Sequence, residues 1–395
     1  MKVLIAAVAF SSEISGVSRH AFNLVRCLLQ RPEISAVHLV VAPWQRKLVQ
    51  SAGLEPNERL ICHIAEVKRS AIGRNLWHYR ELPKLAACLQ VDLVHLSYPV
   101  PIDVAALPCP AVVTLHDLYP YEIPRNFGFP QVLFNRLILW QCLHGVDAIA
   151  CVSDTTRLRL RQYAPPAVSR KATRIYNCVE AASLCAWQSP IPNWRGESFL
   201  LSVAQHRRNK NIALLIQAFR LLLLYPKVDS DIQLVIIGIE GPESRRIHRL
   251  ISACGLEQKV HFFEGLPESD LQWCYARCAA LVAPSLAEGF GLPVAEALMA
   301  GCRVVCSDIP AFREVDSEHC HFVKLGENAE ELLAESIAAA LRSPVKRPVS
   351  LPQFSPAIIA EQYVNLYRQT MTHAAHAQRT LISSFHTATT ERHSS

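Results

Sequence analysis

The sequence has no long hydrophobic run. No uninterrupted apolar stretch approaches the roughly 18 residues that a membrane-spanning helix needs, so we expect no transmembrane helix. The first ten residues do resemble a short signal peptide, with one lysine before an apolar stretch. A turn and an amphipathic segment follow and complete a βα unit, so we interpret this stretch as the first buried strand of a cytoplasmic protein.

The sequence also lacks the spacings of common metal and disulfide sites. Its 14 cysteines include no C-x-x-C pair and stand singly inside apolar segments, as Cys151, Cys254 and Cys306 do. We interpret them as free thiols in a reducing compartment. No H-x-x-x-H pair occurs and no D-x-D stands in a convincing metal-binding loop, so we expect no metal.

Dense positive charge is absent as well. The net charge of +6 comes from 40 basic and 34 acidic residues, a mild excess that suits anionic ligands or an anionic membrane surface. No basic stripe is interleaved with aromatic residues, which argues against a nucleic-acid partner. What the chain does have is length and hydrophobicity. Its 395 residues, of which 50% are hydrophobic, predict two or three packed domains.

Short apolar runs recur along the chain and alternate with helical stretches. This pattern is typical of an α/β fold with parallel sheets covered on both faces. A stretch rich in small residues and proline, 181–196, interrupts the pattern, and we interpret it as a linker. We predict two Rossmann-like domains, at 1–182 and 191–345. A terminal helix at 356–372 and a disordered polar tail at 373–395 would follow them.

The stretch 284–301 combines a glycine loop with two carboxylates. Gly289 and Gly291 come just before a helix, where backbone N–H groups and the helix N-terminus suit a phosphate or another anionic oxygen. Glu288 and Glu296 suit hydroxyl groups, so the combination predicts a sugar nucleotide. The alternative is an ordinary strand-to-helix turn in which glutamate compensates the helix dipole.

The same residues resemble a known motif. The pattern Glu288-Gly-Phe-Gly-Leu-Pro-x-x-Glu296, followed by Gly301-x-x-Val-Val-x-Ser307, is similar to the E-x7-E donor motif of retaining family-4 glycosyltransferases, which have the GT-B fold. The resemblance implies two domains that face each other across a cleft, with the last helix packed back on the first domain. It also implies a reaction that needs no metal.

The resemblance further implies roles for this loop. Glu288 would hold hydroxyl groups of the donor sugar, and Glu296 would bind ribose. The loop between them would approach the sugar and the diphosphate, and the leaving phosphate would itself take the acceptor's proton. The donor-binding residues of the loop are Gly289, Phe290, Gly291 and Leu292.

A basic loop, QHRRNKN, follows the first strand of the second domain. It could be a solvated loop, although the carboxyl end of a strand is where open α/β sheets bind ligands. In the family, an arginine and a lysine of this loop embrace the diphosphate, and Lys210 fits the lysine position. We prefer Arg208 over Arg207 for the arginine. The choice arises because Ala204 and Gln205 stand where the family usually has glycine and arginine.

Two residues of the first domain complete the predicted site. His116 ends an apolar strand, and a histidine in that position commonly packs in the core or caps a neighbouring element. The resemblance implies instead that His116 faces the donor sugar near the sugar's 6-hydroxyl. Gly16 lies in the first βα turn and would allow close approach of the diphosphate or the acceptor. The family often has two adjacent glycines there, whereas this chain has one. The alternative interpretation is therefore an ordinary turn in which a serine caps the helix.

An apolar stretch at 126–144 carries one embedded arginine, Arg136. It could be a core helix behind the cleft, or a membrane-surface helix that delivers a lipid-linked acceptor, as in many relatives. We favour the core helix and leave contact with the inner face of the cytoplasmic membrane open.

Together these features predict a retaining hexosyltransferase. Its donor would be a nucleotide diphosphate sugar. GDP-mannose comes first, because the T-L-H-D sequence at 114–117 and the R-x-N-K-N sequence at 207–211 resemble bacterial mannosyl and rhamnosyl transferases, and UDP or dTDP sugars come next. Its acceptor would be a saccharide or lipid-linked saccharide in polysaccharide or lipopolysaccharide assembly. The alternatives are a GT-B sugar-nucleotide epimerase and a decayed sugar-nucleotide-binding scaffold. Ala204 and the single Gly16 favour the scaffold, whereas the two glutamates and Lys210 argue against it.

Overall fold

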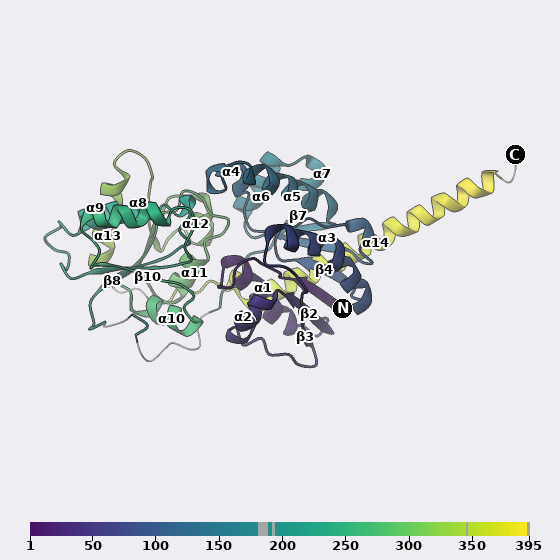
Figure 1. Ribbon diagram of the computed structural model, residues 1–395, viewed down its shortest axis with the longest axis horizontal. Helices are drawn as coiled ribbons and strands as arrows, with labels where there is room; N and C mark the ends of the chain where they lie inside the picture. Colours follow the sequence, from purple (N-terminus) through teal and green to yellow (C-terminus); the bar gives the residue numbers. More distant parts are fainter. Residues whose placement is uncertain (181–188, 192–193, 345–346, 393–395) are drawn as a thin grey trace.

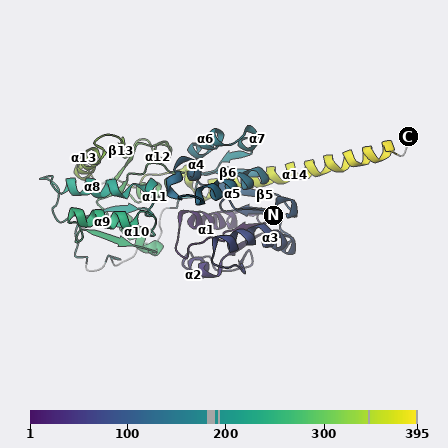
Figure 2. The same ribbon diagram turned by 45° about the horizontal axis from the view of Figure 1, so that its top comes forward.

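The computed structural model describes residues 1–180, 189–191, 194–344 and 347–392, with side chains up to His376. The chain forms two lobes side by side, and a long terminal helix projects from the first (Figures 1 and 2). Each lobe contains one parallel sheet with helices around it, so the predicted pair of Rossmann-like domains is confirmed. Most of the predicted linker lies outside the described residues.

The N-terminal sheet has seven parallel strands. They are β1 (Lys2–Ala6), β2 (Ala36–Val41), β3 (Leu60–Ile64), β4 (Leu93–Leu96), β5 (Ala111–Leu115), β6 (Ala148–Cys151) and β7 (Ala172–Arg174). Their order is β3-β2-β1-β4-β5-β6-β7, and Val3 of β1 lies opposite Val37 of β2 on one side and Leu93 of β4 on the other. Continuous apolar strands fit a sheet that is buried on both faces.

Helices cover the two faces of this sheet. They are α1 (Gly16–Leu29), α2 (Arg46–Ser51), α3 (Ala71–Leu89), α4 (Tyr119–Glu122), α5 (Gln131–Gly145), α6 (Asp154–Tyr163), α7 (Pro166–Ser169) and the terminal helix α14 (Pro356–Arg392). The 3₁₀ turns are η1 (Pro43–Gln45), η2 (Val104–Ala106) and η3 (Pro124–Asn126). α1 and α14 share one core, with Phe22 and Tyr363, and α3 and α5 share the other, with Trp77 and Leu139.

The C-terminal sheet has six parallel strands in the order β10-β9-β8-β11-β12-β13. They are β8 (Phe199–Val203), β9 (Gln233–Ile237), β10 (Val260–Phe263), β11 (Ala280–Ala283), β12 (Val304–Ser307) and β13 (Cys320–Val323). The helices are α8 (Ile212–Leu222), α9 (Ser244–Cys254), α10 (Glu268–Arg277), α11 (Leu292–Met299), α12 (Pro310–Val315) and α13 (Ala329–Arg342), with the 3₁₀ turns η4 (Arg208–Lys210) and η5 (Pro352–Phe354). The basic loop and the glycine loop both follow carboxyl ends of central strands, β8 and β11.

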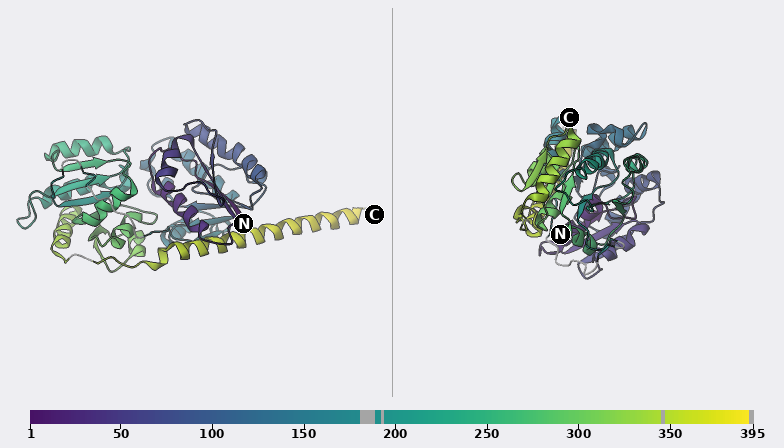
Figure 3. Two further views of the ribbon diagram at one scale, coloured as in Figure 1. Left: turned by 90° about the horizontal axis from the view of Figure 1, so that it is seen from below. Right: turned by 90° about the vertical axis from the view of Figure 1, so that its left-hand side faces the viewer.

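The terminal helix α14 returns to the N-terminal domain and packs against α1. Figure 3 (left) shows it running along this domain and continuing beyond it. The sequence predicts that the helix ends near residue 372 and that 373–395 form a disordered tail, whereas the helix continues to Arg392.

Three further observations concern the described residues. Every cysteine among them is a free thiol. No helix in these ranges combines the length and hydrophobicity that a membrane span requires. No group of three or more His, Cys, Asp or Glu side chains in them is placed to hold a metal ion.

Candidate active site

The glycine loop between β11 and α11 packs directly on the N-terminal domain. A Cβ atom at Gly289 would lie 1.8 Å from the carbonyl oxygen of His116, so only glycine fits there. The Gly289 carbonyl accepts hydrogen bonds from the hydroxyls of Ser153 and Thr156, at the start of α6. Gly291 caps α11 with a φ of 109°, a left-handed conformation that suits glycine. The loop is therefore held between the two domains.

Glu288 lies at the centre of a polar cluster. Its Oε1 accepts hydrogen bonds from Lys210 Nζ at 2.6 Å and Ser285 Oγ at 2.7 Å, and its Oε2 accepts one from the Tyr119 hydroxyl at 3.3 Å. Lys210 ends η4, whereas Tyr119 begins α4 of the other domain. The structure thus brings the predicted residues Glu288 and Lys210 together and adds Ser285 and Tyr119 to them.

Burial shifts the acidity of the groups beside Glu288. It raises the pKa of Tyr119 well above the ordinary value, and the charges of Glu288 and Asp117 raise it further. Burial also raises the pKa of Asp117 to about 6, although the Tyr119 N–H and the charge of Arg207 oppose this shift. Tyr119 therefore keeps its proton and donates a hydrogen bond to Glu288, whereas Asp117 titrates close to neutrality.

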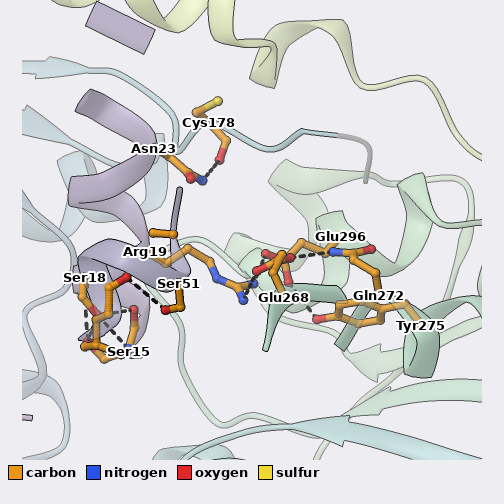
Figure 4. Close-up of polar contacts among 12 residues, drawn as sticks. Ser15, Ser18, Arg19, Asn23, Ser51, Cys178, Glu268, Gln272, Tyr275 and Glu296 are labelled. Atoms are coloured by element: carbon orange, nitrogen blue, oxygen red, sulfur yellow. Dashed lines mark hydrogen bonds and ion pairs between the residues drawn. The ribbon is translucent and has the colours of Figure 1, made fainter. Parts of the chain in front are cut away.

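Glu296 is engaged on both carboxylate oxygens (Figure 4). Its Oε1 accepts a hydrogen bond from Arg19 Nη1 at 2.6 Å, and its Oε2 accepts one from the Tyr275 hydroxyl at 2.8 Å. Arg19 belongs to α1 of the N-terminal domain, and its Nη2 donates to Glu268 Oε2 at 2.6 Å. Burial lowers the pKa of Arg19, but the charges of Glu296 and Glu268 outweigh this effect and raise the pKa above its ordinary value. Arg19 is an ion-pair bridge between the domains.

The Arg19 bridge lies on the wall of a large cavity between the domains. The cavity has a volume of about 550 Å³, a size that holds small molecules. α1 and α2 line one side of it, and the residues around Glu268 line the other. Glu296 opens into this cavity, whereas Glu288 and Lys210 line a separate small pocket between β8, β11 and α11. The two predicted carboxylates therefore face different spaces.

The ring of His116, at the end of β5, is directed into its own domain. Its Nε2 donates to the Ser97 carbonyl at 2.9 Å, and the ring meets His20 edge-on with centroids 5.0 Å apart. Burial lowers the pKa of His116 to about 4, so the ring is neutral at physiological pH. The carbonyl of His116 faces Gly289. A contact between its ring and a donor sugar stays a prediction.

The predicted arginines and Gly16 lie at the starts of two helical segments, η4 and α1. Arg207 and Arg208 are exposed at the start of η4, and the charge of Arg207 acts on Asp117 across the domain boundary. Gly16 is the first residue of α1, and no atom lies within 4 Å of the position its Cβ would take. The cap predicted as the alternative is present too, since the Ser15 hydroxyl accepts a backbone N–H of α1.

Phe290 and Leu292 contribute their side chains to the core. Phe290 is buried, and its ring packs against Tyr176 and Phe354 with centroids 5.9 and 5.0 Å apart. Leu292 begins α11 and packs against the same core. Any contact of these two residues with a donor would therefore involve their backbone.

A second carboxylate of the C-terminal domain caps a helix of the N-terminal domain. Glu314 accepts hydrogen bonds from the backbone N–H of Asp154 and from both the N–H and the hydroxyl of Thr155, the last two at 2.9 Å. These groups form the N-terminus of α6, where a negative charge is favourable. Glu314, the Gly289 loop and Arg19 thus join the domains at three places.

Both halves of the chain match models of known protein families. Residues 14–183 match the model described as Glycosyltransferase Family 4, and residues 188–353 match Glycosyl transferases group 1. The chain is 25% identical over 338 residues to the O-antigen chain mannosyltransferase B of Escherichia coli, covering 80% of this chain and 84% of that protein. It is 28% identical over 207 residues to the O-antigen chain mannosyltransferase RfbU of Salmonella typhimurium, 51% of this chain and 53% of the relative.

Solved structures share the fold. The structure of Anabaena Alr3699/HepE in complex with UDP-glucose has a TM-score of 0.64 at 17% identity and covers 95% of this chain and 99% of its own. WaaG, a glycosyltransferase involved in lipopolysaccharide biosynthesis, has a TM-score of 0.64 at 18% identity, with 94% and 98% covered. The arrangement of two Rossmann-like domains is common to all three proteins.

Proposed function

This chain belongs to the GT-B glycosyltransferases that the group 1 and family 4 models describe, and we propose that it transfers a hexose from a nucleotide diphosphate sugar to an acceptor hydroxyl with retention of configuration. The observation that carries the proposal is the cluster of Lys210, Ser285 and Glu288 beside the glycine loop. In this cluster the Lys210 ammonium lies beside the Glu288 carboxylate. Lys210 would bind the negative charge of the phosphates, and Glu288 would bind the sugar hydroxyls.

In the proposed reaction the bond between the anomeric carbon and the diphosphate oxygen breaks while the acceptor oxygen bonds to the same face of that carbon. The acceptor's proton passes to the leaving diphosphate. Lys210, with Arg208 or Arg207, stabilises the negative charge that grows there, since fixed cations act strongly where water is excluded. Glu288 holds sugar hydroxyls and Glu296 holds the ribose. This mechanism uses no metal ion.

The relatives support a choice of donor and acceptor. Two proteins similar to this chain are O-antigen chain mannosyltransferases, which supports GDP-mannose as the donor. A structural neighbour is in complex with UDP-glucose, so a uridine nucleotide is the second choice. The acceptor would be a saccharide or lipid-linked saccharide of an O-antigen or lipopolysaccharide.

A panel of GDP-mannose, UDP-glucose and dTDP-rhamnose tests the proposal. We expect one donor to raise the melting temperature, because a ligand at a hundred times its Kd adds about 2.7 kcal/mol to the stability. That donor should release its nucleoside diphosphate slowly, and a chelator should leave the release unchanged. Glu288→Gln should lower turnover about a hundredfold or more, while the exposed Glu257→Gln should not. A protein that binds no donor would refute the transferase.

The epimerase alternative would need acid and base carboxylates in the N-terminal half of the cleft. Asp117, with its pKa raised to about 6 by burial, is a carboxyl group in that half. The same panel separates the two functions. An epimerase would return a nucleotide sugar with an inverted centre, and Asp117→Asn would abolish that product.

A further inference from the structure

Arg19 reaches a carboxylate that the proposed function assigns to ribose. It lies in the first turn of α1, and its side chain extends across the domain boundary to Glu296 and Glu268 (Figure 4). The side chains of Arg19 and Glu296 are only 14% and 8% exposed. Breaking a pair this deeply buried is costly, because it would leave one of the two charges without a partner. Arg19 therefore fixes Glu296 before any donor binds.

Glu296 keeps acceptor capacity for a ligand. An ionised carboxylate has about four acceptor positions, two on each oxygen. Within the described part of the chain, its Oε1 accepts one hydrogen bond from Arg19 and its Oε2 accepts one from Tyr275. About one position on each oxygen is therefore left. Glu296 lines the large cavity, so two neighbouring hydroxyl groups of a ligand there, such as the 2′- and 3′-hydroxyls of ribose, would fill both positions.

Both protein partners of Glu296 act as donors. The guanidinium of Arg19 has no acceptor atom and keeps its charge at physiological pH. Burial raises the pKa of the Tyr275 hydroxyl well above its ordinary value, and the charge of Glu296 raises it further. Tyr275 therefore keeps its proton and donates to the carboxylate. A ligand hydroxyl that approaches Glu296 must likewise donate, as a ribose hydroxyl can.

The two donors come from opposite domains. Tyr275 belongs to α10 of the C-terminal domain, which also carries Glu296, whereas Arg19 belongs to α1 of the N-terminal domain. Glu268 accepts from the second nitrogen of the Arg19 fork at 2.6 Å, and Gln272 donates to Glu268 at 2.8 Å. The orientation of the Glu296 carboxylate therefore depends on both domains.

Helix α1 gives Arg19 a rigid base. Ser15 and Ser18 form a capping box at its N-terminus. Further along the same helix, Asn23 donates to the Cys178 carbonyl at 3.2 Å, and Arg26 donates to the Asn23 side chain at 2.6 Å. These contacts tie the cavity-facing side of α1 to its surroundings, so Arg19 presents its guanidinium from a fixed position.

We propose that Arg19 is a positioning residue for recognition of the donor's ribose. It holds Glu296 with an acceptor position open on each oxygen, and the carboxylate thereby selects ribonucleotide donors over 2′-deoxyribonucleotide donors. The inference rests on the proposed function, since it needs a nucleotide sugar in the cavity. It also ranks the donors, because GDP and UDP sugars carry ribose whereas dTDP sugars carry 2′-deoxyribose.

Isothermal titration calorimetry with GDP and 2′-deoxy-GDP, and with UDP and 2′-deoxy-UDP, tests the proposal. We expect the unaltered chain to bind the ribonucleotide of its preferred pair about tenfold or more tightly than the deoxy form, because the deoxy form loses a hydrogen bond to a charged group. Arg19→Met should reduce this ratio to about threefold or less, because the ligand must then order Glu296 itself. Arg19→Lys keeps a cation beside Glu296 and should give an intermediate ratio.

Two further variants separate positioning from stability. Tyr275→Phe removes the donor on the other oxygen without leaving a charge unpaired, so it should also lower the ratio. It carries the same readout if Arg19→Met does not fold. Arg59→Met makes the same substitution away from the cavity, where Arg59 donates to the carbonyls of Arg31 and Ile34 at 2.6 and 2.7 Å. This control lowers stability and should leave the ratio unchanged.

The ratio of the two affinities decides between the outcomes. The proposal fails if Arg19→Met weakens both nucleotides of a pair by the same factor, as a purely structural residue would. It also fails if the ratio rises, because Arg19 would then compete with ribose for Glu296, or if the unaltered chain binds both forms equally. A chain that binds none of the four nucleotides would overturn the proposed function as well, whereas binding with an unchanged ratio in Arg19→Met would overturn only the positioning role.

Discussion

At the scale of single residues, both ends of the candidate site consist of carboxylates that already have partners. Glu288 is paired with Lys210, and Glu296 with Arg19 and Tyr275. A sugar hydroxyl that binds either carboxylate must share it with these donors or displace them. Affinity for a donor is therefore set partly by the strength of the ion pairs that exist before it binds.

Arg19→Met tests the bridge between the domains. The change keeps an unbranched apolar side chain but leaves buried Glu296 with the Tyr275 hydroxyl alone. Loss of one partner of a buried pair costs about 3–5 kcal/mol, and we expect about 3 because Glu268 is half exposed. Denaturant unfolding measures the loss. Arg313→Met removes a solvent-exposed pair with Asp308 and should cost much less than Arg19→Met, so equal losses would contradict the prediction.

Gly289→Ala tests the close approach of the two domains. A methyl group there would collide with the His116 carbonyl, 1.8 Å away, so the domains must separate or the loop must shift. We expect turnover to fall at least about tenfold, as small misplacements at reacting groups do. Gly16→Ala is the control for stability, since its Cβ position is open, and should change the free energy of unfolding by about 0.5 kcal/mol or less. Full activity of Gly289→Ala would refute the contact.

At the scale of elements, α14 closes a polar cluster beneath the strand ends. The Tyr367 hydroxyl lies 2.8 Å from His95 Nδ1, and His95 Nε2 lies 2.9 Å from the Thr114 hydroxyl. Tyr363 of the same helix and His20 of α1 also lie within hydrogen-bonding distance of Thr114. The cluster ties the last helix to the first and to β4 and β5.

Acid should destabilise the fold through its buried histidines. Burial lowers the pKa of His95 to about 3 and those of His78 and His116 to about 4, from an ordinary 6.5. Between these values the unfolded chain binds more protons than the folded one, so stability falls as pH falls from about 6.5 to 4. Each histidine contributes up to about 1.4 kcal/mol per pH unit.

Asp117 has the opposite effect on stability, because burial raises its pKa from 3.8 to about 6. Between these pH values the folded chain binds the proton more strongly than the unfolded chain, so this group stabilises the fold as pH falls. The histidines outnumber it, so the net slope keeps its sign. Unfolding curves across this pH range measure the slope, and His95→Asn should flatten it. A profile that does not change between neutral pH and about 5 would contradict the prediction.

At the scale of the whole molecule, the contacts that hold the two domains together include those of Arg19, the Gly289 loop and Glu314. Glu314→Gln weakens one of them, since an amide oxygen carries no charge for the α6 N-terminus. We expect a loss of about 1 kcal/mol and a larger radius of gyration by small-angle scattering. Glu318→Gln, at an exposed site of the same domain, serves as the control. An identical radius of gyration in both variants would contradict the prediction that Glu314 helps to hold the two domains together.

The sequence predicts what depends on local order along the chain. The two sheets follow from alternating apolar runs, and the two loops that carry Glu288 and Lys210 are also predicted from the sequence. The pairing of Glu288 with Lys210 is not, because it depends on β8 and β11 being neighbours in the sheet. Arg19 and Tyr119 were missed because they reach the site from other elements, and no spacing marks such a contact. The exposure of one face of α5, which includes Trp140, was missed for a different reason, since an apolar helix looks the same whether one face or both are covered.

The return of α14 has a consequence for biosynthesis. Tyr367 lies 272 positions after its partner His95, so the first sheet leaves the ribosome long before the helix that completes its core. At about 5–20 residues per second, translation of that interval takes roughly 15 to 55 seconds. During this time the second domain emerges and folds while one face of the first stays uncovered, which makes the nascent chain a substrate for chaperones that bind apolar surface.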